Sequence, residues 1–207
     1  MARNATPPPK MAAPSKVIDT KQPHVMYVER SAVRVVAFNS AGEVAVVYAA
    51  RDNYYKLPGG GTDPDEEHET AVHREMKEEM GGLIKLREAG CIAITEEYRN
   101  DLRQMSYCYC ADLVDDSGAP ALTKDEVQDE LAHSWMAVDE AKRAMAAAEP
   151  TTELGRFIKE RDLFLLDAAT KDVGKWWSII NWVLGCGLEP ETLSRHHNNR
   201  FSYWNPF

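Results

Sequence analysis

Residues 57–83, LPGGGTDPDEEHETAVHREMKEEMGGL, set three consecutive glycines ahead of a segment crowded with carboxylates. The segment predicts a helix on which Glu75, Glu78 and Glu79, spaced i, i+3 and i+4, project from one face. Like charges so close repel one another unless cations lie among them. Hard divalent cations such as Mg²⁺ take their oxygen ligands from carboxylates and substrate phosphates, and a carbonyl of the glycine loop can add another. The stretch therefore predicts a metal–phosphate site.

The predicted helix has recognisable ends. Asp63 followed by Pro64 favours a start there, and a start nearer Glu67 is equally compatible. We expect the helix to run to about Met80, because the glycine pair at 81–82 is typical of a helix end. Along it, a buried stripe is expected to face the core at Val72, Met76 and Met80.

The flanking sequence predicts a mixed β-sheet. Valine-rich segments at 32–38 and 43–50 surround a turn at 39–42 and predict a hairpin. Extended segments or strands are expected at 53–57, 91–98, 104–114 and 131–138. Helices are expected at about 139–148 and after Thr151 or Thr152, either of which can cap the last helix.

The two ends differ from this central part. Residues 1–24 are rich in proline and lack apolar periodicity, which predicts a disordered tail. Residues 171–207 form an aromatic-rich extension, including Trp176, Trp177 and Trp182. We expect it to dock on its own domain or to support a homodimer, and a lid over the site is the alternative. The domain proper is therefore placed at 25–170.

Composition excludes several classes of function. The chain has 207 residues and a formal charge of −9, which argues against general binding of nucleic acid or of membrane surfaces. A local basic pocket for a phosphorylated small molecule remains compatible with that charge. No apolar stretch predicts a membrane span or a secretory signal, and the four cysteines lack metal-ligand spacing. We therefore expect reduced cysteines and a cytoplasmic location.

Residues 60–82, called the box below, resemble the signature of the Nudix hydrolases. Seven identities fall at that family's spacing: Gly60, Glu66, Arg74, Glu75, Glu78, Glu79 and Gly81. One position departs from the pattern, because Gly82 stands where the family has a bulky apolar residue, and we expect Leu83 to take its place. The alternative is a solvated acidic helix face that only looks like the box.

The resemblance implies an α/β/α sandwich covering about residues 32–169, with Mg²⁺ or Mn²⁺ as the cofactor. It makes Glu75, Glu78, Glu79 and the carbonyl at Gly59 the expected metal ligands. Arg74 resembles the arginine that orients a catalytic glutamate, although it also suits an ordinary i, i+4 pair with Glu78. For Gly60 and Glu66 it implies supporting roles.

The identity of the general base stays open at this stage. Some family members use a glutamate of the box, and others use an acid from a later loop. Three acids here lie in a suitable stretch, although a solvated acidic loop explains them equally: Glu126, Asp129 and Glu130.

Substrate contacts are expected upstream of the glycines. Arg34, Arg51 and Lys56 suit phosphate groups, and Tyr55, or Tyr54, suits stacking on a base. Residues 54–61 are similar to those of Nudix proteins described as nucleotide or 8-oxo-dGTP diphosphatases. This favours a pyrophosphohydrolase acting on a nucleoside diphosphate linked to another moiety, specifically a nucleoside triphosphate.

Three alternatives remain. The acidic residues after the glycines also resemble those of diphosphoinositol polyphosphate phosphohydrolases, whose substrate would need a strongly basic pocket. Hydrolysis at an RNA 5′ end is another, which the net acidity opposes. In a different class of function, a non-catalytic Nudix-like binding module would use the aromatic extension as its surface.

Overall fold

The computed structural model describes the backbone of residues 15–184, and side chains there except those of 125 and 172–184. The expectations for residues 1–14 and 185–207, including Cys186, lie outside the described part. The roles of the tryptophans at 176, 177 and 182 stay predictions because the side chains of residues 172–184 are not described. The domain boundary near 170 also stays a prediction.

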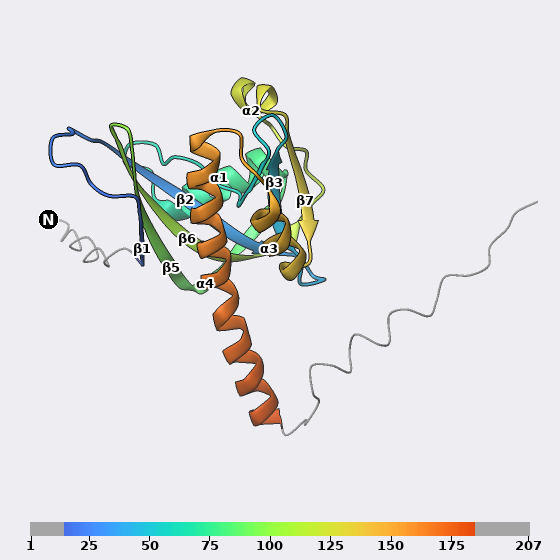
Figure 1. The fold of residues 1–207 in the computed structure, drawn as a ribbon. Helices are drawn as coiled ribbons and strands as arrows, with labels where there is room; N and C mark the ends of the chain where they lie inside the picture. The colour runs from blue at the N-terminus through green and yellow to red at the C-terminus, as the bar shows by residue number, and fades with distance from the viewer. Residues whose placement is uncertain (1–14, 185–207) are drawn as a thin grey trace, which may run out of the picture. The chain divides into compact units, whose positions relative to one another are not determined.

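A mixed sheet forms the centre of the molecule (Figure 1), with strand order β1-β5-β6-β2-β3-β4 and with β7 paired to β3. Its strands are β1 (Lys16–Ile18), β2 (Val28–Phe38), β3 (Val44–Ala49), β4 (Tyr54–Lys56), β5 (Leu83–Arg99), β6 (Leu102–Asp115) and β7 (Leu131–Met136). The predicted strands are all present. The described helices are α1 (His68–Met80), α2 (Lys124–Gln128), α3 (Val138–Ala147) and α4 (Glu153–Leu184).

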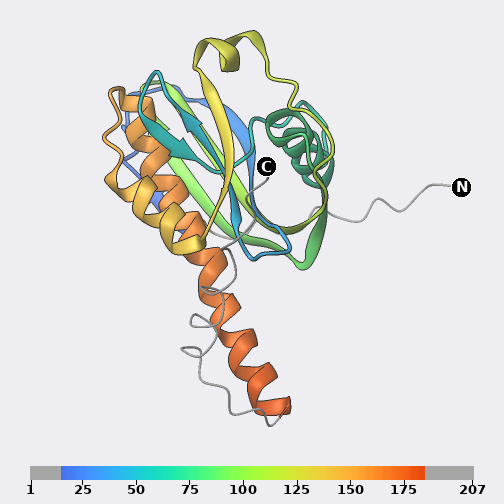
Figure 2. The same cartoon turned by 90° about the vertical axis from the view of Figure 1, so that its right-hand side faces the viewer.

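The sheet lies between helices, with α1 on one face and α3 and the first part of α4 on the other (Figure 2). The predicted α/β/α sandwich is thus confirmed. Val72, Met76 and Met80 of α1 are buried against alternate residues of the sheet, as their spacing predicted. Thr152 caps α4, with its hydroxyl oxygen accepting from the Gly155 amide at 3.2 Å.

Strand β2 has a different main partner from the one expected. It meets β3 at a single register pair, Phe38 with Val44, but runs parallel to β6 along its whole length. The glycine loop takes the other edge of β2, because the amides of Val33 and Val35 donate to the carbonyls of Gly60 (2.9 Å) and Pro58 (3.0 Å). The loop that precedes α1 is therefore fixed to the central strand.

The N-terminal segment corrects one prediction. Residues 1–24 were expected to be disordered, but Lys16–Ile18 forms β1, paired in parallel with β5. Ile18 is 3% exposed, and Lys16 lies 2.9 Å from Glu160 on α4. Three residues are too few for a recognisable alternation, so the strand left no pattern in the sequence.

The end of α1 confirms one prediction and corrects another. Gly81 ends the helix in the left-handed conformation, with φ of 69°. Leu83, however, does not replace the apolar residue missing at Gly82, because it is 52% exposed. Leu113 fills that space instead: its Cδ1 lies 3.1 Å from where a Cβ on Gly82 would be.

Two further findings concern cysteines and membranes. Cys91 and Cys108 are free thiols, as expected. Burial raises the pKa of the Cys108 thiol, so it stays protonated and inert. Within residues 15–184, no helix combines the length and apolar character that crossing a bilayer requires.

Candidate active site

The glycine loop, residues 59–61, lies against a buried carboxylate of α1. Glu79 is 1% exposed, and its oxygens accept from the Gly59 amide at 2.9 Å and from the Lys56 ammonium at 2.5 Å. Gly59 adopts φ of 137°, and a Cβ there would lie 2.2 Å from the Val33 carbonyl oxygen. Only glycine therefore lets the loop pass between β2 and the Glu79 carboxylate.

Glu75 lies against the next glycine. A Cβ on Gly60 would come within 2.4 Å of a Glu75 carboxylate oxygen, so the carboxylate rests directly on the loop backbone. Burial, and then repulsion from Glu79, raise the pKa of the Glu75 carboxyl above its ordinary value. Two buried carboxylates held so close favour a cation beside them.

Arg74 supplies part of that positive charge. Its Nη1 donates to Glu75 at 2.7 Å and to Glu78 at 3.1 Å. Its Nε and Nη2 donate to the two oxygens of Glu66, both at 2.9 Å. The simple surface pair with Glu78 is therefore only one of several contacts, and Arg74 fixes two box glutamates at once.

Glu66 anchors Arg74 from outside the box helix. Hydrogen bonding to Arg74 is the main cause that lowers the pKa of the Glu66 carboxyl to about 2. Arg74 also donates to the Gly61 carbonyl at 2.9 Å. The arginine is thus held by the glycine loop and by Glu66 together.

The donor chemistry of this region fits a hard divalent cation. Glu75, Glu78 and Glu79 project from neighbouring turns of one helix and offer only oxygen ligands. Among the described residues, however, no three His, Cys, Asp or Glu side chains converge as a metal cluster. Their oxygens are instead bonded to Arg74, Lys56 and the loop amide, so a cation would have to compete with those contacts.

The box glutamates open on a cleft of about 330 Å³. Most of the expected residues line it: Arg34, Lys56, Gly59, Gly60, Arg74, Glu75, Glu78 and Glu79. Arg34 is 5% exposed, and its Nη1 donates to the carbonyls of Val33 (2.6 Å) and Gly60 (3.3 Å). Residues from β2, β4 and α1 that are far apart in sequence therefore meet in one cleft.

Three expected residues are not among those lining the cleft. Arg51 forms an ion pair with Asp129 at 2.6 Å. Tyr55 packs on Tyr48, with ring centroids 4.6 Å apart, while its neighbour Tyr54 lines the cleft. Successive side chains of a strand point to opposite faces, so only one of the two tyrosines can reach it. Glu66, the third, is hydrogen-bonded to Arg74, which does line the cleft.

The cleft also contains residues that the sequence did not single out. They are Arg30, Glu97, Arg99, Gln104 and Arg161. One signal was present: Arg161 interrupts the apolar face of α4, where a charge is costly unless it has partners. The other four belong to strands β2, β5 and β6, and only the parallel pairing of β2 with β6 places Arg30 opposite Gln104.

One of the later acids also reaches the cleft. Glu126 of α2 lines it, and its carboxylate accepts from the amide and hydroxyl of Thr123 at 2.7 and 2.9 Å. Asp129 is the partner of Arg51, and Glu130 adopts φ of 53° in the turn before β7. Of the three acids, Glu126 is thus the one placed to take part.

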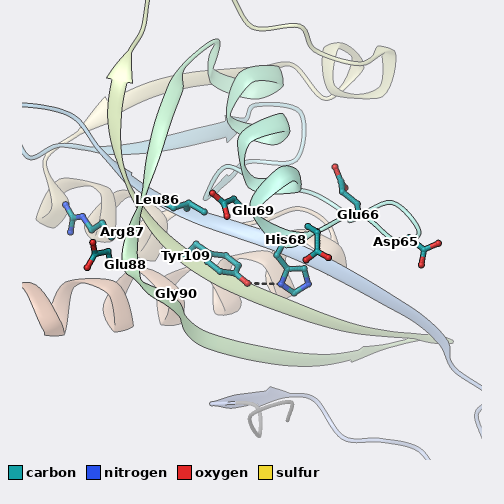
Figure 3. Close-up of a pocket in the computed structure, with 10 residues that line it drawn as sticks. Asp65, Glu66, His68, Glu69, Leu86, Arg87, Glu88, Gly90 and Tyr109 are labelled. Atoms are coloured by element: carbon teal, nitrogen blue, oxygen red, sulfur yellow. Dashed lines mark hydrogen bonds between the residues drawn. The ribbon is translucent and has the colours of Figure 1, made fainter. Parts of the chain in front are cut away.

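A second hollow, of about 850 Å³, lies near the start of α1 (Figure 3). Its lining holds Asp65, Glu66, Glu67, Glu69 and Glu88, and His68 is hydrogen-bonded to the Tyr109 hydroxyl at 2.8 Å. Among its lining residues only Arg87 offsets these five carboxylates, whereas six Lys or Arg side chains line the first cleft, so the second hollow repels a polyphosphate. Its size notwithstanding, this hollow does not suit the substrate that the box implies.

Comparisons with known proteins agree with the geometry. A family model described as "NUDIX domain" matches residues 28–154. Among solved structures, the ORF135 protein of E. coli has a TM-score of 0.50 at 16% identity, covering 70% of this chain and 91% of that one. An Ap4A hydrolase of C. elegans has a TM-score of 0.50 at 19% identity, covering 70% and 98%. No curated protein matches the chain.

Proposed function

This chain belongs to the NUDIX family and hydrolyses a phosphoanhydride bond, and from that premise we propose that it acts on a nucleoside diphosphate linked to another moiety, specifically a nucleoside triphosphate. The observation that carries the proposal is the meeting of glycine loop, box glutamates and Arg74 at one cleft. A divalent cation, Mg²⁺ or Mn²⁺, is part of the proposal.

The residues proposed to hold that cation are Glu75, Glu78, Glu79 and the Gly59 carbonyl. The chemistry it supplies is neutralisation of phosphate charge and activation of the attacking water. Arg74 keeps Glu75 and Glu78 at fixed positions, which lowers the entropic cost of assembling the site. We assign contact with a phosphate oxygen to Lys56, which lines the cleft beside Glu79.

Hydrolysis joins the water oxygen to phosphorus and breaks the bond from phosphorus to the bridging oxygen, which leaves on the departing phosphate. A carboxylate must accept the proton of the attacking water. We assign this task to a glutamate of the box, with Glu126 as the alternative because it lines the same cleft. We assign stacking on a base to Tyr54 rather than Tyr55, because Tyr54 lines the cleft.

One observation favours a second substrate. Arg30, Arg34, Arg99 and Arg161 bring four guanidinium groups to the cleft, the kind of group that a diphosphoinositol polyphosphate would require. The non-catalytic alternative has less support, because every glutamate of the box is present and arranged around Arg74.

Release of phosphate and pyrophosphate in the presence of Mg²⁺ or Mn²⁺ tests the proposal. The substrates are canonical and oxidised nucleoside triphosphates, dinucleoside polyphosphates, nucleotide sugars, capped RNA and diphosphoinositol polyphosphates. Glu78→Gln should lower kcat at least a hundredfold, whereas Glu69→Gln, an exposed residue of the same helix, should not. If wild type and Glu78→Gln are equally inert on all substrates, the chain is a binding module instead.

A further inference from the structure

Four arginines gather at the end of the cleft formed by the sheet and α4. Arg30 and Arg34 come from β2, Arg99 from the end of β5, and Arg161 from α4. Arg30 and Arg34 are four residues apart on one strand, so their side chains share a face of the sheet. Arg30 also donates to Gln104 of the neighbouring strand at 2.9 Å.

These arginines outnumber the acids that contact them directly. Arg161 is bonded to Asp162 at 2.7 Å and lies 3.7 Å from a Glu97 oxygen. Glu75 and Glu79 also act on Arg30 and Arg34 through their charge, but their direct contacts are with Arg74 and Lys56.

Burial makes this arrangement costly. Arg34 is 5% exposed and Arg161 is 1% exposed. Burial, and then repulsion from Arg161, lower the pKa of the Arg34 guanidinium to about 10, so it is still charged at neutral pH. A folded protein keeps such a cluster of like charges at the expense of stability, as binding sites for anions commonly do.

The hydrogen bonding of these arginines also supports an anion site. Within the described residues, the Nε atoms of Arg34 and Arg99 are buried and lack an acceptor. A buried donor without an acceptor destabilises the folded state, so it is normally satisfied by a ligand or by water. Both residues line the cleft, and a phosphate oxygen is the acceptor that guanidinium groups bind best.

We propose that Arg30, Arg34, Arg99 and Arg161 form an anion subsite that binds a phosphate of the substrate other than the two joined by the cleaved bond. This inference rests on the proposed function and narrows its substrate class. It selects phosphoanhydrides that carry at least one further phosphate, such as a nucleoside triphosphate over the diphosphate, or a highly phosphorylated inositol. Glu97 opposes that binding and limits its strength.

Matched ligand pairs test the subsite. Each pair differs by one phosphate: nucleoside triphosphate and diphosphate, NADPH and NADH, coenzyme A and dephospho-coenzyme A. Wild type should prefer the more phosphorylated member in kcat/KM by about tenfold or more, the effect of one charge-assisted contact. Arg99→Gln and Arg30→Gln should remove most of that preference, and Glu97→Gln should increase it. Arg143→Gln, an exposed arginine of α3, should leave it unchanged.

Direct binding separates this inference from the proposed function. Calorimetry with inorganic tripolyphosphate and pyrophosphate in EDTA requires no hydrolysis and no metal. Tighter binding of tripolyphosphate, weakened in Arg99→Gln and strengthened in Glu97→Gln, supports the subsite even if no substrate is turned over. Efficient hydrolysis with no preference within any pair, or equal effects of the opposite charge changes at 97 and 99, overturns the subsite and leaves the hydrolase intact.

Discussion

Glu75 illustrates how a residue proposed to hold the cation can act against stability. It is 6% exposed, lies on the glycine loop, and faces the repulsion of Glu79. Arg74 offsets only part of the effect of burial and repulsion, since the pKa of the Glu75 carboxyl is still raised. A cation bound between the two glutamates would remove the remaining repulsion, so metal binding and stability should be coupled at this residue.

Metal addition should therefore raise the melting temperature. With Mg²⁺ or Mn²⁺ at a hundred times Kd, binding to the folded state adds about 2.7 kcal/mol to the free energy of unfolding. Glu75→Gln should lose most of that gain, and Glu69→Gln should keep it. The measurement is thermal unfolding in EDTA and in metal. An equal increase in wild type and Glu75→Gln would place the cation elsewhere.

Glu66 carries a pH dependence whose sign follows from Arg74. Its pKa in the folded protein, about 2, is below the ordinary glutamate value of about 4.3, so its contribution to stability is present above pH 4.3 and is lost as pH falls towards 2. Glu66→Gln should cost about 1.5 kcal/mol at pH 6 and lower kcat, because Arg74 loses its charged anchor. Urea unfolding at pH 6 and pH 2.5 checks this. A stability difference between wild type and Glu66→Gln that is as large at pH 2.5 as at pH 6 would exclude the charge as its cause.

At the scale of elements, α4 is tied to the site through one buried side chain. Asp162 is fully buried, accepts from the Leu57 amide at 2.9 Å, and is bonded to Arg161. Leu57 directly precedes the glycine loop, so this contact fixes where the loop begins. The helix thereby positions the loop from the face opposite to α1.

Asp162→Asn should consequently destabilise the protein strongly. Removing the charged partner of buried Arg161 should cost about 3–5 kcal/mol in the free energy of unfolding. Asp167→Asn is the matched control on the same helix, since its ion pair with Lys142, at 2.7 Å, is exposed and worth less than about 1 kcal/mol. Chemical denaturation compares the two, and similar losses would show that the buried pair is not special.

The end of α1 is a second element-scale connection. Gly81 and Gly90 both have positive φ, of 69° and 66°. A Cβ on Gly81 would lie 2.6 Å from the Gly118 carbonyl oxygen, whereas one on Gly90 meets nothing within 4 Å. The Ala121 amide of the same loop donates to the Glu78 carbonyl at 2.7 Å, so the packing at Gly81 connects α1 to the loop before Glu126.

Alanine at these two glycines should separate backbone strain from crowding. Gly90→Ala should cost about 1–2 kcal/mol in stability through its left-handed backbone alone, with activity unchanged. Gly81→Ala should cost clearly more and should also lower kcat, because the displaced loop shifts Glu78. Denaturation and steady-state kinetics measure both effects. Equal losses of stability with full activity in both variants would refute the connection.

At the scale of the whole molecule, the features that could be predicted from the sequence are those that depend on the spacing of neighbouring residues. The helix with Glu75, Glu78 and Glu79 on one face follows from a period of 3.6, and its end follows from Gly81. The arginine end of the cleft could not be predicted, because Arg30, Arg99 and Arg161 meet only through the pairing of distant strands and the docking of α4. Tyr54 and Tyr55 show the same limit, since alternation does not reveal which of two neighbours faces inward.

The N-terminal strand is the whole-molecule feature most open to test, because it joins a segment expected to be disordered to both the sheet and α4. Ile18→Ala removes a side chain that is 3% exposed and should cost about 2–5 kcal/mol in the free energy of unfolding. Val17→Ala, the adjacent residue at 52% exposure, should cost less than about 0.5 kcal/mol. Urea denaturation of both variants measures the difference, and hydrogen exchange should show protected amides at residues 16–18. If Ile18→Ala is as stable as Val17→Ala, β1 contributes nothing to the stability of the folded state, and the stable fold begins at β2.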